Sequence, residues 1–155
     1  MAAPHAVTQN AAWATLFAAF VLLAACAEDS MALRGSEPNY TMVFFDSGSA
    51  ALGKQAKQRL SDVVLNPWEP IKTVLKPDSS QKICVTGNSD NTGSEAANKE
   101  FAQRRAEAVA KYLVELGVSQ ERIVVRSLGS SKPLVITPPN TREVTNRRVE
   151  IIFGC

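Results

Sequence analysis

The stretch Lys82–Gly117 reads KICVTGNSDNTGSEAANKEFAQRRAEAVAKYLVELG and decides the fold of this chain. Its first residues, Lys82–Thr86, are largely apolar or β-branched and predict a short buried strand. The segment Gly87–Ser94 is polar with a glycine near each end, and it predicts a loop. From Glu95 to Leu116, apolar residues recur three and four positions apart, which predicts a long helix with one face in the core. Gly117 is a typical helix terminator, so the stretch predicts a strand, a loop and a helix in that order.

Three more strands and one more helix are predicted around this unit. The strands are Tyr40–Phe45, Arg122–Ser127 and Asn146–Phe153, and the helix is Leu52–Val64. We expect Ser49 to cap that helix, because a serine hydroxyl can accept a hydrogen bond from a free amide of the first turn.

Proline and glycine interrupt the two long connections of the chain. Three prolines predict an irregular segment at 66–80 with no more than one helical turn, at Ile71–Leu75, and the segment 128–145 is predicted as a loop. The order β-α-β-α-β-β predicts an α/β protein of the α+β sandwich type, with two helices packed on one face of a small mixed sheet. Two strand–helix–strand units imply parallel strand pairs, and the last loop permits an antiparallel pair.

The composition restricts the function. The 155 residues are enough for one domain and a leader, and 45% hydrophobic with 21% charged residues is a globular composition. The net charge of +2 is too small to indicate a nucleic-acid partner. The single histidine, His5, lies in the segment Met1–Ala27, which has no charged side chain. If that segment is removed, histidine-dependent catalysis and histidine metal sites are excluded, and we expect no metal and no cofactor.

The amino-terminal residues predict a lipid anchor. Ala11–Leu23 is an apolar run with the length of a signal-peptide core, too short to span a bilayer. It ends in Leu23-Ala24-Ala25-Cys26, which resembles the bacterial lipobox. The resemblance implies cleavage before Cys26 and acylation of its thiol, and several acyl chains anchor a soluble domain. The predicted parts are a signal peptide (1–25), a lipidated tether (26–39) and a domain (40–155). An uncleaved anchor, or a buried helix with Cys26 in the core, remains the alternative.

Several motifs together resemble the OmpA-like domain. They are the loop Gly87–Gly93, Asn98, the helical segment Gln103–Val109, the opening Phe44–Ser47 and the closing Asn146–Ile151. A lipobox ahead of such a domain resembles a peptidoglycan-associated lipoprotein. The resemblance implies non-covalent binding of peptidoglycan through the diaminopimelate of its stem peptide, which would tether the outer membrane to the cell wall. It also implies a position on the periplasmic face of the outer membrane, which Ala27 favours because the aspartate that retains enteric lipoproteins in the inner membrane is absent there.

The resemblance also implies which residues hold the ligand. The family's aspartate falls on Asp90, its arginine on Arg105, and the asparagine between them on Asn98. This chain has Asn88-Ser89 where the family usually has His-Thr, so Ser89 keeps a hydroxyl beside Asp90. The complete set expected to bind diaminopimelate is Asp90, Arg105, Asn98, Ser89, Asn91, Thr92 and Gly93, with Arg147 as a candidate at the rim of the pocket.

The chemistry of these residue types fits the far end of diaminopimelate, which carries an ammonium and a carboxylate on one carbon. Asp90 can accept hydrogen bonds from the ammonium, and Arg105 can hold the carboxylate through two parallel bonds, a geometry that lysine lacks. Backbone N–H groups of Asn91–Ser94, at the start of the long helix, offer further donors. A lysine-type stem peptide has no second carboxylate and would leave Arg105 without its partner.

Two further arginines alternate along the last predicted strand. Arg147 and Arg148 therefore face opposite sides of the sheet and cannot both reach one ligand. We expect Arg148 to have a structural role, paired with acidic surface residues.

Other roles stay open from the residues alone. Asp90 could cap its turn, and Arg105 could be solvated or pair with Asp90. A peptidoglycan-cleaving enzyme would need a second carboxylate beside Asp90, for which Glu95 and Glu107 are the candidates. Both glutamates fall on the polar side of the predicted helix, so we expect a binding protein and not an enzyme. A flagellar stator subunit, or a scaffold whose main partner is a Tol-type periplasmic protein, are two more alternatives.

Two cysteines follow the lipidation candidate. Cys84 lies in a predicted strand and Cys155 is the last residue. In an oxidising periplasm they could form a disulfide, which by loop entropy would contribute about 4 kcal/mol. Alternatively, Cys84 is a buried thiol and the end of the chain is frayed. Two thiols without a histidine make a poor zinc site.

Overall fold

The structure is a computed structural model that describes residues 39–67 and 69–155. The predicted signal peptide, the tether as far as residue 38, and the lipidation candidate Cys26 lie outside the described residues. Among the helices that the structure describes, none combines the length and the apolar character needed to cross a membrane.

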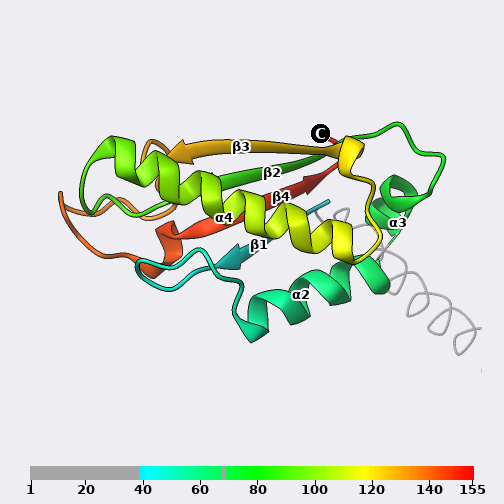
Figure 1. Cartoon of the computed structure of the whole chain (residues 1–155), viewed down its shortest axis with the longest axis horizontal. Coiled ribbons are helices and arrows are strands. Elements are labelled where there is room, and N and C mark those ends of the chain that lie inside the picture. Colours follow the sequence, from blue (N-terminus) through cyan, green and yellow to red (C-terminus); the bar gives the residue numbers. More distant parts are fainter. Residues whose placement is uncertain (1–38, 68) are drawn as a thin grey trace, which may run out of the picture. The chain divides into compact units, whose positions relative to one another are not determined.

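Four strands form one sheet, in the order β1-β4-β2-β3 (Figure 1). The strands are β1 (Tyr40–Phe44), β2 (Ile83–Asn88), β3 (Ile123–Gly129) and β4 (Arg148–Phe153). Strands β2 and β3 are parallel, while β4 is antiparallel to both of its neighbours, β1 and β2. The sheet is therefore mixed, as predicted.

One of the two expected parallel pairs does not form. Strand β4 lies between β1 and β2, so these two strands share no hydrogen bonds. The inward-facing residues of β4 explain this placement, because Val149, Ile151 and Phe153 are all fully buried. A strand of that kind is stabilised most in the middle of a sheet, and the long preceding loop lets it return there.

Within the described residues, three α-helices accompany the sheet: α2 (Lys54–Leu65), α3 (Glu69–Leu75) and α4 (Glu95–Glu115). Two 3₁₀ turns, η1 (Gln120–Arg122) and η2 (Val144–Asn146), precede β3 and β4. Helix α4 lies across β2, β3 and β4, and α2 lies against β1 (Figure 1). Both helices bury their apolar faces in one core with the inward residues of the strands, which confirms the predicted packing of two helices on one face.

Helix α4 approaches β2 very closely at Gly87. A β-carbon added at that position would lie 1.9 Å from the backbone oxygen of Ala102. Only glycine therefore allows this contact, which holds the end of β2 and the first turns of α4 together. The loop between β2 and α4 is therefore held at both of its ends.

Two local predictions were wrong. Helix α2 begins at Lys54 with Gly53 at its N-cap, so Ser49 does not cap it and instead accepts a hydrogen bond from the amide of Ala51 at 3.1 Å. The segment after α2 contains the seven-residue helix α3 and not a single turn. Its proline, Pro70, stands in the first turn, where the missing amide hydrogen costs nothing.

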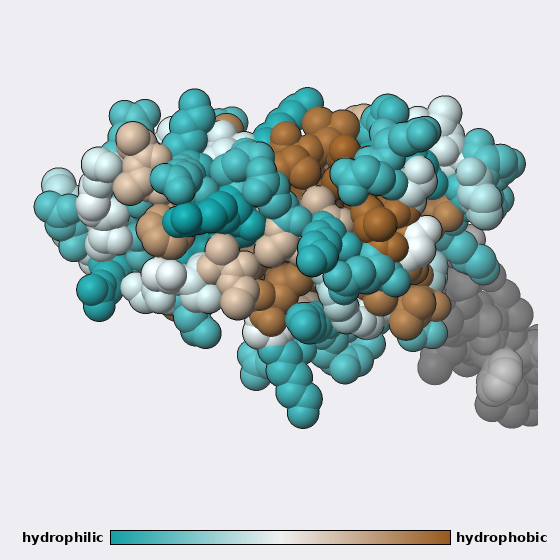
Figure 2. Space-filling model, viewed as in Figure 1, coloured by the Kyte–Doolittle hydropathy of each residue, from teal (hydrophilic) through white to brown (hydrophobic). Residues whose placement is uncertain are grey.

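The two ends of α4 lie in different surroundings. Figure 2 shows a mainly hydrophilic face, with several groups of hydrophobic side chains around the carboxyl-terminal half of α4. A shallow groove there is lined by Leu65, Leu75, Leu116 and Val118 among others. The amino-terminal end of α4, at the opposite end of the helix, meets the polar loops that follow β2 and precede β4 (Figure 1).

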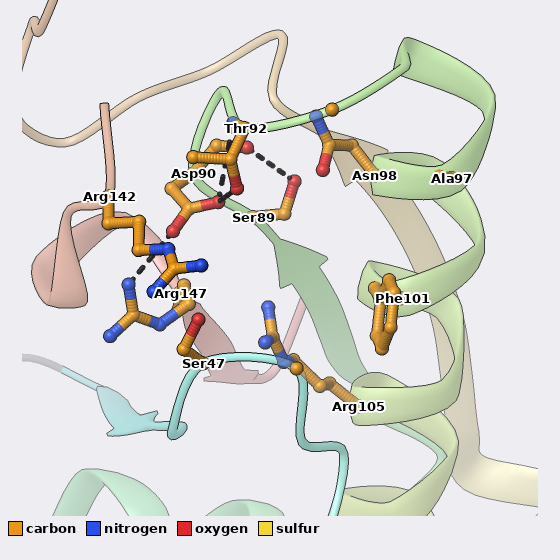
Figure 3. A pocket seen from close by; sticks show the side chains of 12 residues that line it. Ser47, Ser89, Asp90, Thr92, Ala97, Asn98, Phe101, Arg105, Arg142 and Arg147 are labelled. Carbon is orange, nitrogen blue, oxygen red and sulfur yellow. Dashed lines mark hydrogen bonds and ion pairs between the residues drawn. The ribbon is translucent and has the colours of Figure 1, made fainter. Parts of the chain in front are cut away.

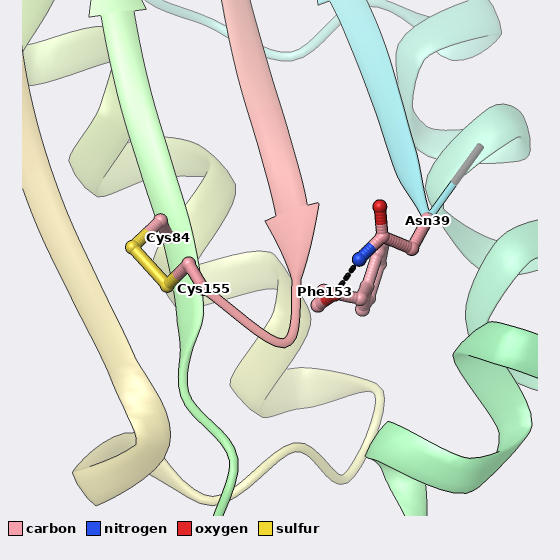
Figure 4. The surroundings of a disulfide bond; sticks show 4 residues. All are labelled: Asn39, Cys84, Phe153 and Cys155. Atoms are coloured by element: carbon pink, nitrogen blue, oxygen red, sulfur yellow. Dashed lines mark hydrogen bonds between the residues drawn. A yellow bond between two sulfur atoms is a disulfide. The ribbon is translucent and has the colours of Figure 1, made fainter.

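Cys84 and Cys155 form a disulfide, with their Cα atoms 5.9 Å apart (Figure 4). It joins β2 to the residues that follow β4. On the other side of β4, the Asn39 amide donates to the carbonyl oxygen of Phe153 at 2.6 Å. The carboxyl-terminal end of the chain is thus held to both neighbouring strands.

Candidate functional site

Asp90 lies in the loop between β2 and α4, and only 4% of its surface is exposed. Its Oδ1 atom accepts a hydrogen bond from the Thr92 hydroxyl at 2.7 Å, and the amide of Thr92 lies 3.5 Å away. Its Oδ2 atom forms an ion pair with Nη1 of Arg147 at 2.8 Å. The carboxylate thus stabilises its own turn and binds an arginine that is 57 residues away in the sequence.

Arg147 comes from the end of η2, directly before β4. It is 9% exposed, and its Nε donates to the carbonyl oxygen of Phe45 at 3.1 Å. We expected Arg147 at the rim of the pocket. It lines the cavity, but it is buried beside Asp90. Its neighbour Arg148 points the other way, as expected, and its Nε donates to the Glu150 carboxylate at 2.8 Å.

Arg105 projects from α4 and is only 2% exposed. Its guanidinium donates to backbone carbonyl oxygens of the turn after β1: Nε to Ser49 at 2.8 Å and Nη2 to Asp46 at 3.2 Å. The rings of Phe45 and Phe101 lie near it, with their centroids 5.5 and 5.8 Å from its central carbon. Arg105 is therefore neither solvated nor paired with Asp90, and no carboxylate in the described part of the chain neutralises it.

These side chains face one cavity of about 270 Å³ (Figure 3). Seven of the eight residues expected at the ligand line it, all except Asn91. The complete lining is Ser47, Gly48, Ser89, Asp90, Thr92, Gly93, Ala97, Asn98, Phe101, Arg105, Arg142 and Arg147.

Asn91 uses its side chain to fix a second loop. Its amide nitrogen donates to the carbonyl oxygens of Thr137 and Pro138, and its oxygen accepts from the amide of Thr141 at 2.9 Å. Asn91 therefore holds the loop between β3 and β4 against the loop that carries Asp90.

Asn98 points into the cavity from the first turn of α4 (Figure 3). It is 6% exposed, and its side-chain amide has no hydrogen-bond partner among the residues that the structure describes. Asn98, Phe101 and Arg105 are three and four positions apart, so they share one face of the helix. The amide is available to a ligand in the cavity.

The sequence interpretation missed several lining residues. Phe101 stands one helical turn from both Asn98 and Arg105, so its position could have been predicted from spacing. Ser47 and Gly48 belong to the turn after β1 and carry no comparable signal. Arg142 reaches the cavity from the loop between β3 and β4, and its position depends on contacts between segments far apart in the sequence.

The electrostatics of the cavity are dominated by arginine. Burial raises the pKa of Asp90, but hydrogen bonds from Thr92 and Arg147 outweigh it, so the net pKa is lowered and the carboxylate is charged at neutral pH. Burial and, next, the charge of Arg147 lower the pKa of Arg105, yet arginine stays protonated in proteins. One carboxylate and three guanidinium groups line the cavity.

A two-carboxylate site is not formed here. Glu95 and Glu107 are exposed on α4, and neither lines the cavity with Asp90. Residues 39–67 and 69–155 also contain no group of three side chains from His, Cys, Asp and Glu that could hold a metal ion.

A helix-covered mixed sheet, with a polar and positively charged cavity at the end of β2, defines a small α+β domain. The chain belongs to the OmpA family, whose sequence signature matches residues 44–147.

Relatives support the same assignment. The chain is 34% identical over 108 residues to the outer-membrane lipoprotein YfiB of Pseudomonas aeruginosa, covering 70% of this chain and 64% of that protein. It is 38% identical over 80 residues to the peptidoglycan-binding protein ArfA of Mycobacterium tuberculosis, covering 52% of this chain and 24% of that protein. The crystal structure of the peptidoglycan-associated lipoprotein from Burkholderia pseudomallei superposes with a TM-score of 0.60 at 28% identity, covering 72% of this chain and 87% of that one.

These relatives are named as binding proteins and lipoproteins and not as enzymes. The chain spans less than two thirds of the length of YfiB and about a quarter of the length of ArfA. The similarity is therefore to a domain that larger proteins also contain.

Proposed function

We propose that this protein binds peptidoglycan without cleaving it, through the free amino-acid end of diaminopimelate in the stem peptide. One observation carries the proposal. A buried carboxylate, Asp90, lines the same cavity as a buried guanidinium, Arg105, that has no carboxylate partner in the part of the chain that the structure describes. This arrangement matches a ligand that carries an ammonium and a carboxylate on one carbon.

Asp90 retains capacity for an ammonium. A carboxylate offers about four acceptor positions. Thr92 takes one or two of them at Oδ1, and Arg147 takes one at Oδ2. At least one position is left for a ligand, and its charge makes that hydrogen bond stronger than a neutral one.

Arg105 retains capacity for a carboxylate. A guanidinium has five N–H donors, and three of them point to the carbonyl oxygens of Ser49, Asp46 and Asn88. Two donors remain, one on each terminal nitrogen, which suits a carboxylate held by two parallel bonds. The carbonyl contacts and the two aromatic rings keep the guanidinium in place before the ligand arrives.

The same geometry predicts selectivity. A lysine-type stem peptide would place an ammonium near Asp90 but nothing against the free donors of Arg105. A buried charged donor without its partner costs about 1–3 kcal/mol or more, so binding of such a peptide should be much weaker. Asn98 adds one more donor and acceptor on the side of α4.

We further propose that acylation of Cys26 attaches the protein to the periplasmic face of the outer membrane. The lipobox-like residues Leu23–Cys26 support this, and YfiB is named an outer-membrane lipoprotein. Residues 26–39 would then be the tether, which spans at most about 50 Å when fully extended. The domain 40–155 would bind the wall within that distance of the membrane.

Sedimentation with purified peptidoglycan tests the binding. The full chain in detergent should pellet with diaminopimelate-type sacculi and release no soluble muropeptides. Release of muropeptides would instead identify a hydrolase. A membrane-fraction mass shift that disappears in Cys26→Ser would test the lipid anchor separately.

A second function, contact with another envelope protein of the Tol type, is favoured by one feature of the surface. Leu134, Val135 and Ile136 are consecutive and exposed in the loop between β3 and β4, and Ile136 is 91% exposed. Exposed apolar groups of this kind mark protein contacts. Ile136→Ser should weaken capture of a periplasmic partner and leave sedimentation with sacculi unchanged.

A further inference from the structure

We infer that the cavity has a second carboxylate-binding subsite, formed by Arg142, so that the ligand is a stem peptide read at two carboxylates. The inference rests on the proposed function and goes further, because it names the part of the peptide that Asp90 and Arg105 do not account for.

The charges of the cavity favour a second anion. Asp90 and Arg147 neutralise each other at 2.8 Å. Arg105 and Arg142 remain, and neither has a carboxylate partner among residues 39–67 and 69–155. A zwitterionic ligand tip has no net charge and leaves the cavity with two excess positive charges. An additional carboxylate on the ligand compensates one of them.

The two unpaired arginines enter the cavity from different sides. Arg105 comes from α4, together with Asn98 and Phe101, whereas Arg142 extends from the loop between β3 and β4, on the side of Asp90 and Arg147 (Figure 3). If the two remaining donors of Arg105 bind one carboxylate, Arg142 would therefore bind a different one.

The backbone around Arg142 is fixed on both sides. The amide of Thr141 donates to Asn91 at 2.9 Å, and the carboxylate of Glu143 accepts from the amide of Thr145 at 2.9 Å. Glu143 is the acidic residue next to Arg142 in the sequence, and its hydrogen bonds go to Thr145. The exposed Arg142 side chain thus starts from a defined position, and its guanidinium forms no hydrogen bond within the described chain.

A stem peptide offers two carboxylates near the diaminopimelate tip. One is the α-carboxylate of the D-glutamate that precedes diaminopimelate and is linked through its side chain. The other is the carboxylate at the near end of diaminopimelate, which is free when that residue is the last of the peptide. Both present the same chemistry to a guanidinium, so the experiment has to distinguish them.

Calorimetric titrations of the full chain in detergent test this subsite. The ligands are the tripeptide L-Ala-γ-D-Glu-meso-diaminopimelate, the same peptide amidated at the D-glutamate carboxylate, and the same peptide amidated at the near diaminopimelate carboxylate. The variants are Arg142→Gln and the control Arg126→Gln, which removes the same charge from an exposed position on β3 outside the cavity. All titrations use one ionic strength, because attraction between charges depends on salt.

We expect Arg142→Gln to weaken binding of the tripeptide about tenfold, the effect of losing one charged hydrogen-bonding pair. Arg126→Gln should change it less than about twofold. One of the two amidations should weaken binding to the unaltered protein by the same factor and have no further effect in Arg142→Gln, since the two changes remove one interaction. That amidation identifies the carboxylate.

Other outcomes overturn the subsite. If Arg142→Gln weakens all three ligands equally, Arg142 acts through its general field or through loop position and does not bind a carboxylate. If neither amidation matters, there is no second carboxylate contact, although binding of all three peptides would still support the proposed function. If the unaltered protein binds none of the peptides, both the subsite and the proposed function are wrong.

Discussion

The carboxylate of Asp90 pairs with Arg147, with 2.8 Å between Oδ2 and Nη1, and not with Arg105. Both residues of the pair are buried, and each keeps the other from being an isolated charge. The pairing leaves Arg105 as a positioned guanidinium, whose hydrogen bonds among the described residues go to backbone carbonyl oxygens. One arginine therefore fixes the Asp90 carboxylate, and the other has no carboxylate partner among residues 39–67 and 69–155.

Asp90→Asn should abolish sedimentation with sacculi and lower the free energy of unfolding by about 3 kcal/mol at pH 7. The amide cannot neutralise Arg147, and breaking a buried ion pair leaves an uncompensated charge. Denaturant unfolding followed by circular dichroism measures the second effect. Asp78→Asn is the matched control, because Asp78 is exposed and does not line the cavity, and it should change neither quantity.

The stabilisation from Asp90 should depend on pH in a defined direction. Burial raises the pKa of Asp90, but hydrogen bonds from Thr92 and Arg147 together lower it by more than burial raises it. The pKa in the folded state therefore lies below the unfolded value of about 4. A depressed pKa stabilises the folded state above the unfolded pKa, and that contribution is lost as pH falls through the folded pKa. The difference in unfolding free energy between the unaltered protein and Asp90→Asn should be constant from pH 7 to pH 5 and shrink below about pH 4. A difference that persists undiminished at pH 2 would contradict this assignment.

Arg105→Lys should weaken binding of diaminopimelate peptides at least tenfold although the positive charge is kept. Lysine cannot donate to Ser49 and Asp46 and also form two parallel bonds to a carboxylate. Isothermal titration measures the loss. Arg104→Lys is the control. Arg104 is the preceding residue of α4, and its exposed side chain pairs with Glu100. Equal effects of Arg105→Lys and Arg104→Lys on binding would mean that Arg105 contributes no specific contact with the ligand.

The part of the site within one segment was predictable from sequence. Helical spacing places Asn98 and Arg105 on one side of α4, and Asp90 precedes them in the short loop after β2. The glycine-bounded loop and the terminating Gly117 carry equally local signals. For this reason the strand–loop–helix unit was predicted correctly, while the ligand-binding role of the residues along it stays a prediction.

The remainder depends on the position of β4. Its insertion between β1 and β2 brings Arg147 against Asp90 and carries the preceding loop, with Arg142, to the cavity. Strand order is decided by burial of the whole sheet and not by spacing along the chain. The Asp90–Arg147 ion pair and the position of Arg142 therefore could not be predicted from local patterns.

Gly87→Ala should destabilise the fold by more than about 3 kcal/mol or prevent folding. The added methyl group would lie 1.9 Å from the backbone oxygen of Ala102, and a backbone clash cannot be relieved by rotating a side chain. Thermal unfolding measures the effect. Gly53→Ala is the control, because no atom lies within 4 Å of the new methyl group, and it should change stability by less than about 1 kcal/mol. If both variants unfold alike, α4 does not pack on β2 as closely as described.

Removing the disulfide should cost about 4 kcal/mol of unfolding free energy. The bond closes a loop with a sequence separation of 71, and the restriction of the unfolded chain grows with loop length. Cys155→Ser should therefore unfold at lower denaturant concentration, and adding a reductant should destabilise the unaltered protein but not this variant. Neither Cys84 nor Cys155 lines the cavity, so binding of diaminopimelate peptides under native conditions should be unchanged. A reductant effect of equal size in Cys155→Ser would show that the bond is not the source of the stabilisation.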